Sequence, residues 1–450
     1  AAATAFWPPP PDERGWPALF GPDEDSSSRA WIDLGRIAER GPVEKWRRAI
    51  GTGYSSPVTA DGRLIVQQRV PAVDRSSDGS ADLAQVTEAG VDARARSGAG
   101  PSEAEPLYTA VSPDDEVIAC YDLETGEPLW EHRYPTTYEC QFEYTNGPYG
   151  TPRIDGGRVY TLGAQWQARC LDLTTGSVVW RRDLAADYDV EEGLFGFGPG
   201  ILIDGGRMIF NLGAADAGVI ALDAATGGTL WTSGRDRAGY TMPRVASVHG
   251  KRYAFVLTFE GLQALDPATG EQRFFVPFTN KVPMSVAATS PLVWDDRVLL
   301  VTGPGPGALC LRVAPDGGYE EVWKDRRAID SQWNTLVRVD GVLYGFTSKH
   351  RDTAFRAIDL ADGAVRWSWP SAIERGTALR TRNALILWGE HGHLAFLDID
   401  ANRQRLRWIS KRPLLETPTY ASPAFDDGLL VLRNEGRLVC LSVRPEDLAN

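Results

Sequence analysis

The sequence predicts an all-β fold, a single ring of eight blades that each contain four antiparallel strands. Three observations predict it: a recurring LDxxTGxxxW run, a two-residue turn motif that precedes each run, and a spacing of 39 to 51 residues between repeats. Four short strands in about 45 residues, repeated eight times, are the pattern of a β-propeller.

The first motif is a turn that contains a glycine and is followed by a tryptophan. It reads YDLETGEPLW at 121–130, LDLTTGSVVW at 171–180 and LDAATGGTLW at 222–231. Asp and Thr side chains bond the free N–H groups of such a turn, and Gly tolerates a left-handed backbone there. We expect this position to end the third strand of each blade. Along the chain it is occupied by Asp122, Asp172, Asp223, Asp266, Arg312, Asp359, Asp398 and Ser442.

The second motif is a tight turn between the first and second strands of each blade. Six of the eight pairs contain Gly, and the other two contain Asp or Asn, which also tolerate positive φ. The pairs are Asp61-Gly62, Asp155-Gly156, Asp204-Gly205, His249-Gly250, Asp295-Asp296, Asp340-Gly341, Arg382-Asn383 and Asp427-Gly428.

An aromatic residue stands near the start of the fourth strand in almost every blade. A large aromatic side chain buries about 150–250 Å². Because the residue recurs around the ring, it does not mark a single active site, and we predict that it anchors neighbouring blades to one another. These residues are Trp130, Trp180, Trp231, Phe274, Trp323, Trp367 and Trp408.

The eighth blade lacks a fourth strand of its own, because the sequence stops at Asn450. The segment GPVEKWRRAI at 41–50 reads as a fourth strand without the three strands that precede it. If this segment pairs with the C-terminal blade, Trp46 becomes the missing anchor. The ring then closes through an N-terminal strand, which removes exposed sheet edges.

Two segments differ in composition from the repeats. Residues 1–40 include WPPPPDERGWP, in which proline removes N–H donors and disfavours helix, so we expect an extended N-terminal arm. The propeller then spans 41–450, with an insertion at 70–115 in the first blade that is rich in Ala, Ser, Asp and Gly. We expect the insertion to contain a short helix, and to be a solvated excursion, a lid or a docking arm.

Composition and charge exclude several functions. The chain has 47 Lys and Arg against 60 Asp and Glu, a net charge of −13, so it lacks the basic surface that nucleic acids and anionic membranes require. It contains no run of 18 apolar residues, and we expect no transmembrane segment. The first residues, AAATAF, fit a mature chain after removal of a signal peptide and fit a shortened chain equally well. We expect a periplasmic or secreted protein of the cell envelope.

The blade signature, a strand followed by LDxxTG and xxxW, resembles that of the pyrroloquinoline-quinone (PQQ)-like β-propeller repeat proteins of bacteria. This group includes quinoprotein alcohol dehydrogenases and the outer-membrane assembly lipoprotein BamB. GWPALFGPDEDSSS at 15–28 and GYSSPVTADGRL at 53–64 are most similar to the planctomycete-type members. The resemblance covers roughly residues 15–443 and implies the fold, whereas fold alone does not imply an activity.

The residues that quinoprotein catalysis would need are not evident. The resemblance would imply a vicinal Cys-Cys disulfide and a Glu, Asn and Asp set for Ca²⁺; the chain has no Cys-Cys pair, and no such set can be assigned. We therefore expect neither PQQ nor calcium, and we assign no catalytic residue. His391 and His393 are weak candidates for a metal site, because no third ligand is evident, and we favour surface histidines.

Topology limits where a binding site can lie. In a propeller the hairpins between second and third strands share one face with the connections between blades. Five blades place an aromatic residue three positions before the Pro or Leu of the first strand, and we expect these residues to surround the channel mouth on that face. They are Tyr54, Tyr149, Tyr240, Trp333 and Tyr420.

Two long connections between blades add acidic residues to this face. We expect Glu143, Glu191 and Glu192 to supply negative charge, so that the mouth prefers cations or neutral polyols over anions. Aromatic side chains beside carboxylates suit a polar ligand such as a sugar or a peptide segment. The alternative is that the aromatic residues only fill the channel.

Two functional classes therefore stay open. The first, which we favour, is a non-catalytic cell-envelope propeller with a scaffold or assembly role similar to that of BamB. It would bind an envelope protein, a carbohydrate or another polar ligand through its loop-rich face. The second is a quinoprotein-like dehydrogenase or a carbohydrate-active enzyme that uses the same face.

Overall fold

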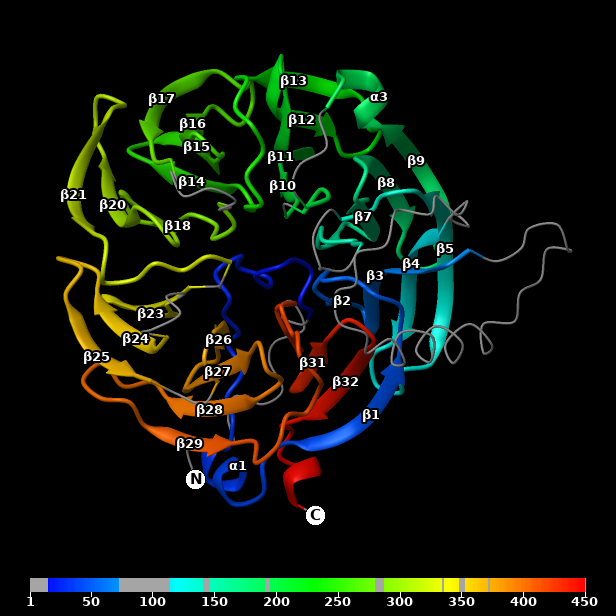
Figure 1. The fold of residues 1–450 in the computed structure, drawn as a ribbon, viewed down its shortest axis with the longest axis vertical. Coiled ribbons are helices and arrows are strands. Elements are labelled where there is room, and N and C mark those ends of the chain that lie inside the picture. The colour runs from blue at the N-terminus through cyan, green and yellow to red at the C-terminus, as the bar shows by residue number, and fades with distance from the viewer. Residues whose placement is uncertain are drawn as a thin grey trace, which may run out of the picture.

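Eight four-stranded antiparallel sheets stand side by side around one central axis (Figure 1). The computed structural model describes residues 15–72, 114–140, 146–190, 195–198, 200–279, 287–333, 336–347, 353–370 and 373–449. Each of the first seven blades uses four strands that are consecutive in the chain. The prediction of an eight-bladed β-propeller is confirmed.

The strands of each blade follow one another from the central channel to the outer edge of the ring. The first blade contains β2 (Val58–Ala60), β3 (Arg63–Pro71), β4 (Asp114–Asp122) and β5 (Pro128–Thr136). The second contains β6 (Arg153–Asp155), β7 (Arg158–Leu162), β8 (Gln167–Asp172) and β9 (Val178–Asp183). The third contains β10 (Leu202–Asp204), β11 (Arg207–Ala214), β12 (Ala217–Asp223) and β13 (Thr229–Ser233). The fourth contains β14 (Arg244–Val248), β15 (Lys251–Leu257), β16 (Gly261–Leu265) and β17 (Gln272–Pro277).

The second half of the ring follows the same order. The fifth blade contains β18 (Leu292–Trp294), β19 (Arg297–Thr302), β20 (Gly307–Val313) and β21 (Tyr319–Asp325). The sixth contains β22 (Val337–Val339), β23 (Val342–Phe346), β24 (Phe355–Asp359) and β25 (Val365–Trp369). The seventh contains β26 (Gly376–Arg380), β27 (Ala384–Gly389), β28 (Leu394–Asp398) and β29 (Leu406–Ile409). The eighth contains β30 (Ala424–Asp426), β31 (Leu429–Arg433), β32 (Arg437–Ser442) and β1 (Val43–Ala49).

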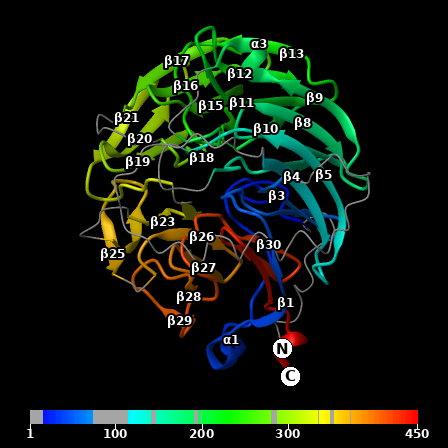
Figure 2. The same cartoon turned by 45° about the vertical axis from the view of Figure 1, so that its right-hand side comes forward.

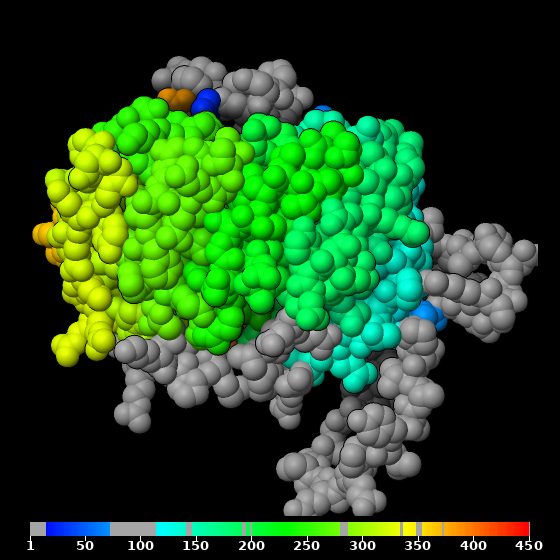
Figure 3. All heavy atoms as spheres, turned by 90° about the horizontal axis from the view of Figure 1, so that it is seen from above, coloured from blue at the N-terminus to red at the C-terminus, as the bar shows by residue number. Residues whose placement is uncertain are grey.

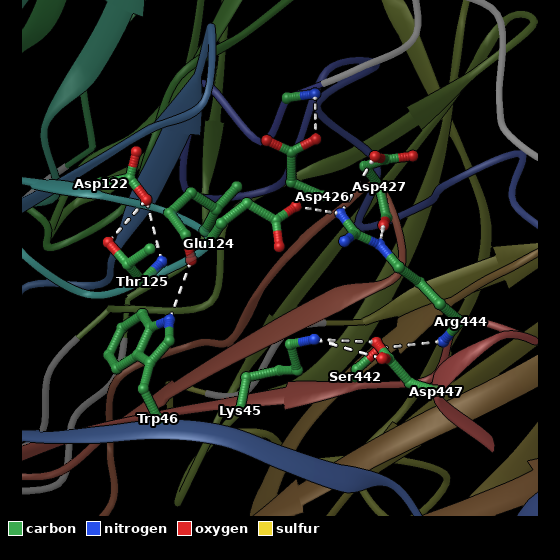
Figure 4. Close-up of polar contacts among 12 residues, drawn as sticks. Lys45, Trp46, Asp122, Glu124, Thr125, Asp426, Asp427, Ser442, Arg444 and Asp447 are labelled. Carbon is green, nitrogen blue, oxygen red and sulfur yellow. Dashed lines mark hydrogen bonds and ion pairs between the residues drawn. The ribbon is translucent and has the colours of Figure 1, made fainter. Parts of the chain in front are cut away.

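Both ends of the described chain build the eighth blade, as predicted. Strand β1 pairs antiparallel with β32, and Trp46 lies opposite Cys440. Figure 4 shows the polar contacts around this junction, in which Lys45 pairs with Asp447. The Arg444 guanidinium lies 2.6 Å from a carboxylate oxygen of Glu124, which belongs to the first blade. The ring is therefore closed by strand pairing and by contacts between its first and last blades.

The tryptophans of the outer strands form one kind of joint between consecutive blades. In six of them the indole N–H donates to a backbone carbonyl of the following blade, with donor–acceptor distances of 2.9 to 3.2 Å. These pairs are Trp46–Leu123, Trp130–Leu173, Trp180–Ala224, Trp231–Pro267, Trp323–Leu360 and Trp367–Asp400. Phe274 instead packs against Tyr319, and Trp408 packs against Gly41. Hydrophobic side chains of neighbouring blades fill the space between them, as Tyr160 and Phe210 do.

Each joint also explains the glycine of the LDxxTG turn. The indole of Trp130 lies against Gly176, where an added Cβ would lie only 2.5 Å from the ring. Within the turn itself, the Asp122 carboxylate accepts hydrogen bonds from the backbone N–H and the hydroxyl of Thr125, both at 2.9 Å. The motif is therefore a blade-joining turn, in which Asp and Thr fix the backbone and Gly makes room for the tryptophan.

The turns between first and second strands occur at the expected places in six blades and one residue later in two. In the second blade Asp155 pairs with Arg158, so that the turn is Gly156-Gly157. In the third blade Asp204 pairs with Arg207, and Gly205-Gly206 forms the turn. Two consecutive glycines allow positive φ at both central positions, 54° and 74° in the second blade, so the strand keeps its aspartate.

The N-terminal arm crosses the face that carries these turns, which we call the turn face. The arm is not extended throughout, contrary to expectation, because Leu34–Arg40 forms helix α1, capped by the Asp33 side chain. In Figures 1 and 2 this blue segment runs from the centre of the ring to α1 at its outer edge. Residues 1–14 lie outside the described part of the chain.

The contacts of the arm include backbone hydrogen bonds to inner strands of two separate blades. The Trp16 N–H donates to the Thr59 carbonyl of the first blade at 2.9 Å, and the Thr59 N–H donates back to the Trp16 carbonyl. The Ser28 N–H donates to the Arg380 carbonyl of the seventh blade at 2.8 Å. Residues 15–28 therefore span the turn-face end of the central channel.

The insertion of the first blade begins and ends within a regular strand pair. Strands β3 and β4 stay paired up to Val70 with Asp115 and Pro71 with Asp114, so the expected ends of the insertion belong to the blade. Residues 73–113, with the expected short helix, lie outside the described residues.

Figure 3 shows one side of the ring, on which consecutive blades, coloured from cyan to yellow, form a continuous wall.

Candidate functional site

The five aromatic residues expected at the channel mouth lie around one cavity. Each precedes the innermost strand of its blade, on the face that carries the hairpins between second and third strands and the connections between blades, which we call the loop face. The cavity has a volume of about 240 Å³, whereas a single ordered water needs about 10–15 Å³ on the same scale. The five residues that line it are Tyr54, Tyr149, Tyr240, Trp333 and Tyr420.

The aromatic rings form a nearly continuous arc. The ring centroids of Trp333 and Tyr420 lie 5.0 Å apart, and those of Tyr420 and Tyr54 lie 5.1 Å apart, both in edge-to-face geometry. Tyr54 continues to Tyr149 at 6.0 Å. These separations lie in the range that favours aromatic pairs. The arc, which we call the aromatic mouth, is thus a set of mutually supported side chains.

A sixth aromatic residue completes the aromatic mouth between the second and third blades. Phe195 lies 6.4 Å from Tyr149 and 6.0 Å from Tyr240 between ring centroids. The Tyr240 hydroxyl donates to the Phe195 carbonyl at 2.8 Å and accepts from the Phe195 N–H at 3.1 Å. Phe195 was not among the predicted site residues, although its connection is rich in aromatic residues, because it does not occupy the repeated position before the inner strand.

The N-terminal arm supplies the floor of the cavity. Leu19 and Phe20 line it, and the arm beside them is bonded to the second blade, where the Ile154 N–H donates to the Pro17 carbonyl at 2.8 Å. The channel is therefore closed on the turn face and lined by aromatic side chains on the loop face. Leu19 and Phe20 contribute to the site although sequence patterns gave no sign of it, because the arm lies outside the repeats.

The described lining of the cavity carries positive charge, and the acidic residues expected there are not among the described residues. Among the described lining residues the ionised side chains are Arg244 and Arg375, and none is acidic. Glu143, Glu191 and Glu192 lie outside the described residues. A described carboxylate does reach the rim, where the Tyr54 hydroxyl donates to Glu435 at 2.5 Å. The described wall is therefore positive rather than negative.

The two arginines are held in different ways. Arg375 forms a bidentate ion pair with Glu390, in which Nε and Nη2 lie 2.8 and 2.6 Å from the two carboxylate oxygens. Its guanidinium carbon also lies 5.9 Å from the centroid of the Trp333 ring. Arg244 is buried, and its guanidinium lies over the Phe20 ring at 4.2 Å. Burial lowers the pKa of Arg244 to about 10, which leaves the group protonated at neutral pH.

The sequence places Arg244 in a pattern that two blades share. It follows Pro243 in YTMPR at 240–244, just as Arg153 follows Pro152 in YGTPR at 149–153. An arginine at the start of an innermost strand is unusual, because that strand faces the channel and its neighbours. The aromatic residue three positions before the proline or leucine recurs in five blades, whereas the arginine directly after it occurs in two, so the repeat pattern does not single it out.

Tyr149 and Tyr240 of the aromatic mouth are neutral at physiological pH. Burial raises the pKa of Tyr240 to about 12. Burial and the nearby Cys140 raise the pKa of Tyr149 well above its ordinary value. These phenols therefore act as hydrogen-bond donors, acceptors and apolar surfaces, and they add no charge to the cavity.

The structure separates the two histidines that were candidates for a shared metal. His393 Nδ1 lies 3.1 Å from the Ser410 carbonyl, within its own blade. His391 Nε2 instead lies 3.2 Å from a carboxylate oxygen of Glu374 and 3.8 Å from one of Glu390. These three side chains form a group of potential ligands that the sequence did not reveal, because Glu374 comes from the connection that precedes the blade.

The group around His391 is better described as an ion-pair network. Glu390 is buried, and both of its carboxylate oxygens already accept hydrogen bonds from Arg375. A cation next to His391 would have to compete with this guanidinium for the same oxygens. The His391 side chain is 45% exposed and that of Glu374 is 54% exposed, so this pair lies at the surface.

Several solved structures share the fold of the chain. A structure of BamB from Moraxella catarrhalis has a TM-score of 0.51 at 14% identity, and the match covers 76% of this chain and 93% of that one. Quinohemoprotein alcohol dehydrogenase from Comamonas testosteroni has a TM-score of 0.60 at 13% identity, over 96% of this chain and 80% of that one. At this level of identity the likeness concerns the fold alone.

The described residues do not fit a calcium-dependent quinone site. Calcium needs six to eight oxygen ligands that include carboxylates, and the described wall of the cavity contains no Asp or Glu. All five cysteines are free, and four of them are buried where blades pack together. The described cavity therefore offers neither the ligands for the cation nor the vicinal disulfide that the resemblance to quinoproteins would imply.

Curated relatives match a shorter part of the chain. BamB of Kangiella koreensis is 29% identical over 190 residues, which are 42% of this chain and 44% of that protein. BamB of Yersinia pestis is 25% identical over 191 residues, 42% of this chain and 45% of that protein. The chain thus spans less than half the length of these relatives.

In the part of the chain that the structure describes, no helix is long and apolar enough to cross a membrane.

The family model described as outer membrane protein assembly factor BamB matches residues 114–369. That range covers more than half of the chain and runs from the third strand of the first blade to the end of the sixth. Together with the repeated blade-joining turns, it shows that the chain belongs to the BamB family.

Proposed function

We propose that the protein is a non-catalytic β-propeller of the cell envelope that acts as a scaffold in outer membrane protein assembly. Membership of the BamB family and the name shared by its curated relatives support this role. We further propose that an envelope protein or another ligand binds on the loop face. The observation that carries this site is the aromatic mouth, to which five blades each contribute one side chain around a single cavity.

The chemistry of the aromatic mouth suits binding. Tyr, Trp and Arg are the residues that most often dominate binding energy at protein interfaces, and Trp333, Tyr420 and Arg375 lie together here. Aromatic side chains lose little conformational entropy when they are packed against one another before binding. The edge-to-face contacts therefore make the aromatic mouth a preformed docking surface.

The titratable groups of the described cavity wall support a binding role over a catalytic one. Efficient general acids and bases have pKa values near the working pH. The pKa of Tyr240 is raised to about 12 and that of Arg244 is lowered only to about 10, both because of burial. Neither group exchanges a proton readily near neutral pH.

Site-specific photo-crosslinking in cells tests the proposed face. A photoreactive amino acid would replace Trp333 or Tyr420 on the aromatic mouth, with Asp61 and Asp340 on the turn face as matched controls. We expect crosslinks to outer membrane assembly proteins from the mouth positions, and none from the controls. Crosslinks to those proteins from the turn-face positions alone would contradict the proposed site.

A further inference from the structure

The wall beneath the aromatic mouth offers hydrogen-bond donors in excess of acceptors. The Ser56 hydroxyl oxygen accepts from the Ser422 N–H at 2.9 Å, and the Thr151 hydroxyl oxygen accepts from the Ser56 N–H at 3.2 Å. The Ser290 hydroxyl oxygen accepts from the Met242 N–H at 2.8 Å. All three hydroxyls line the cavity. Within the described residues, none of them has an acceptor for its own proton.

Arg244 adds a cation whose pairing is incomplete. Its Nε donates to the Pro291 carbonyl at 3.3 Å, whereas neither Nη1, which is sealed from solvent, nor Nη2 has a hydrogen-bond partner among the described residues. The nearest acid, Glu24, has an oxygen 3.9 Å from Nη1. Glu24 is itself engaged by Arg153 at 2.5 Å, so one carboxylate serves two guanidinium groups.

This arrangement leaves local positive charge in a chain whose net charge is −13. A buried charge without full hydrogen bonding is costly, and proteins normally pair it. Burial lowers the pKa of Arg244, which shows the cost, yet the group stays charged at neutral pH. An anion in the cavity beside Arg244 would balance this charge, and hydroxyl groups of the wall can donate to its free oxygens.

The aromatic side of the cavity determines the chemistry of the rest of the ligand. Tyr149, Tyr240 and Trp333 present apolar ring surface, which suits an aromatic or aliphatic body. One incompletely paired guanidinium matches a single negative charge better than a dianion. A carboxylate also matches the planar geometry of a guanidinium.

We infer that the cavity binds the carboxylate of a ligand whose remaining part is aromatic or apolar. The carboxylate lies at Arg244, and the body lies against the aromatic mouth. This inference rests on the proposal that the loop face is the binding face, and it reverses the preference for cations and polyols that the sequence suggested. The carboxylate can come from a free organic acid or from the C-terminus of a peptide.

Calorimetric titration of the full chain with matched probes tests the inference. The first pair is 2-naphthoate and 2-naphthamide, which share a shape and differ in charge. The second pair is the tripeptide Gly-Trp-Phe with a free and with an amidated C-terminus, and inorganic phosphate is the fifth probe. We expect at least one acid to bind tenfold or more tightly than its amide and than phosphate. Tight naphthoate binding supports a free acid as ligand, and tight binding of the peptide acid alone supports a chain terminus.

Variants then place the bound carboxylate. Arg244→Met should abolish the preference for acid over amide, whereas Arg252→Met, an exposed arginine of the same blade, should leave it unchanged. Because Arg244→Met can fail to fold, thermal unfolding is measured first. Quenching of tryptophan fluorescence in the unaltered protein, lost in Trp333→Phe, provides a second readout.

Two results would overturn the inference. One is equal affinity for acids and amides, and the other is a preference for acids that survives Arg244→Met in a folded variant. Both leave the proposed docking face intact, because that face is tested separately by crosslinking at Trp333 and Tyr420.

Discussion

Trp46 donates its indole N–H to the carbonyl oxygen of Leu123 across 3.0 Å. Trp46 lies on β1, the outer strand of the eighth blade, and Leu123 follows β4 in the first blade. The same bond joins other consecutive blades, but only here does it connect the blade built from both chain ends to its neighbour. Closure of the ring therefore uses the same joint as its interior (Figure 4).

Replacement of this tryptophan should destabilise the whole ring. We expect Trp46→Ala to lower the free energy of unfolding by about 3 kcal/mol, the lower end of the range for tryptophan, since the side chain is only partly buried. The control is Leu230→Ala, because Leu230 is 49% exposed on an outer strand; its effect should stay within about 0.5 kcal/mol. Chemical denaturation measures the free energy of unfolding of both variants. Equal losses in Trp46→Ala and Leu230→Ala would contradict closure of the ring through this joint.

Two glycines of the second blade separate backbone strain from packing. Gly176 and Gly157 have similar φ values, 70° and 74°, but an added Cβ meets Trp130 at 2.5 Å in the first case and nothing within 4 Å in the second. Gly157→Ala should cost about 1–2 kcal/mol from the left-handed backbone alone. Gly176→Ala should cost about 1–3 kcal/mol more, because the methyl group displaces the indole. Comparable losses in the two variants would show that the tryptophan joint is loosely packed.

A buried polar network between the first two blades contains a carboxyl group that titrates unusually. Glu116 is fully buried and accepts hydrogen bonds from the Tyr134 hydroxyl at 2.6 Å, Gln67 Nε2 at 3.1 Å and the Ala164 N–H at 2.8 Å. Burial raises its pKa, although these hydrogen bonds and Arg169 oppose the shift. Gln67 Oε1 has no hydrogen-bond partner among the described residues, so an acceptor is available for a proton at this site.

The raised pKa of Glu116 predicts a pH-dependent stability. A carboxyl group whose pKa is higher in the folded state adds stability below its unfolded pKa, near 4.5, which is lost as the pH rises through the folded value. We expect Glu116→Gln to remove this loss, because an amide remains neutral and can donate to Gln67 Oε1 once that side chain turns. The stability of the variant relative to the unaltered protein should therefore increase as the pH rises above 4.5 in denaturation series. A constant difference across the series would contradict a raised pKa.

The fold could be predicted from the sequence because its determinants are local and repeated. The LDxxTG turn, the two-residue turn between first and second strands and the tryptophans each appear several times, so an ambiguity in one blade is resolved by the others. The predicted turn of the second blade lies one residue early, because Asp155-Gly156 and Gly156-Gly157 are both good turn pairs. Only the pairing of Asp155 with Arg158 decides between them.

The aromatic mouth was predictable, whereas the arginines of its wall were not. Tyr54, Tyr149 and Tyr240 occupy one repeated position and therefore meet at the axis. Arg244 and Phe20 come together only through the path of the N-terminal arm, which no repeat encodes. The acidic connections dominated the sequence-based expectation, since their residues are numerous, but the described wall of the cavity is formed largely by residues beside the inner strands and by the arm.

The central claim is that the aromatic mouth is the docking surface. Its most direct test measures how tightly the partner identified by crosslinking binds three purified proteins. These are the unaltered chain, a variant with Trp333→Ala and Tyr420→Ala, and a control with Tyr319→Ala, an aromatic residue that is 39% exposed on an outer strand. Loss of two packed aromatic side chains from an interface should cost about 2 kcal/mol or more. We predict about thirtyfold weaker binding by the mouth variant and an unchanged affinity for the control. Unchanged affinity of a folded mouth variant would contradict the account.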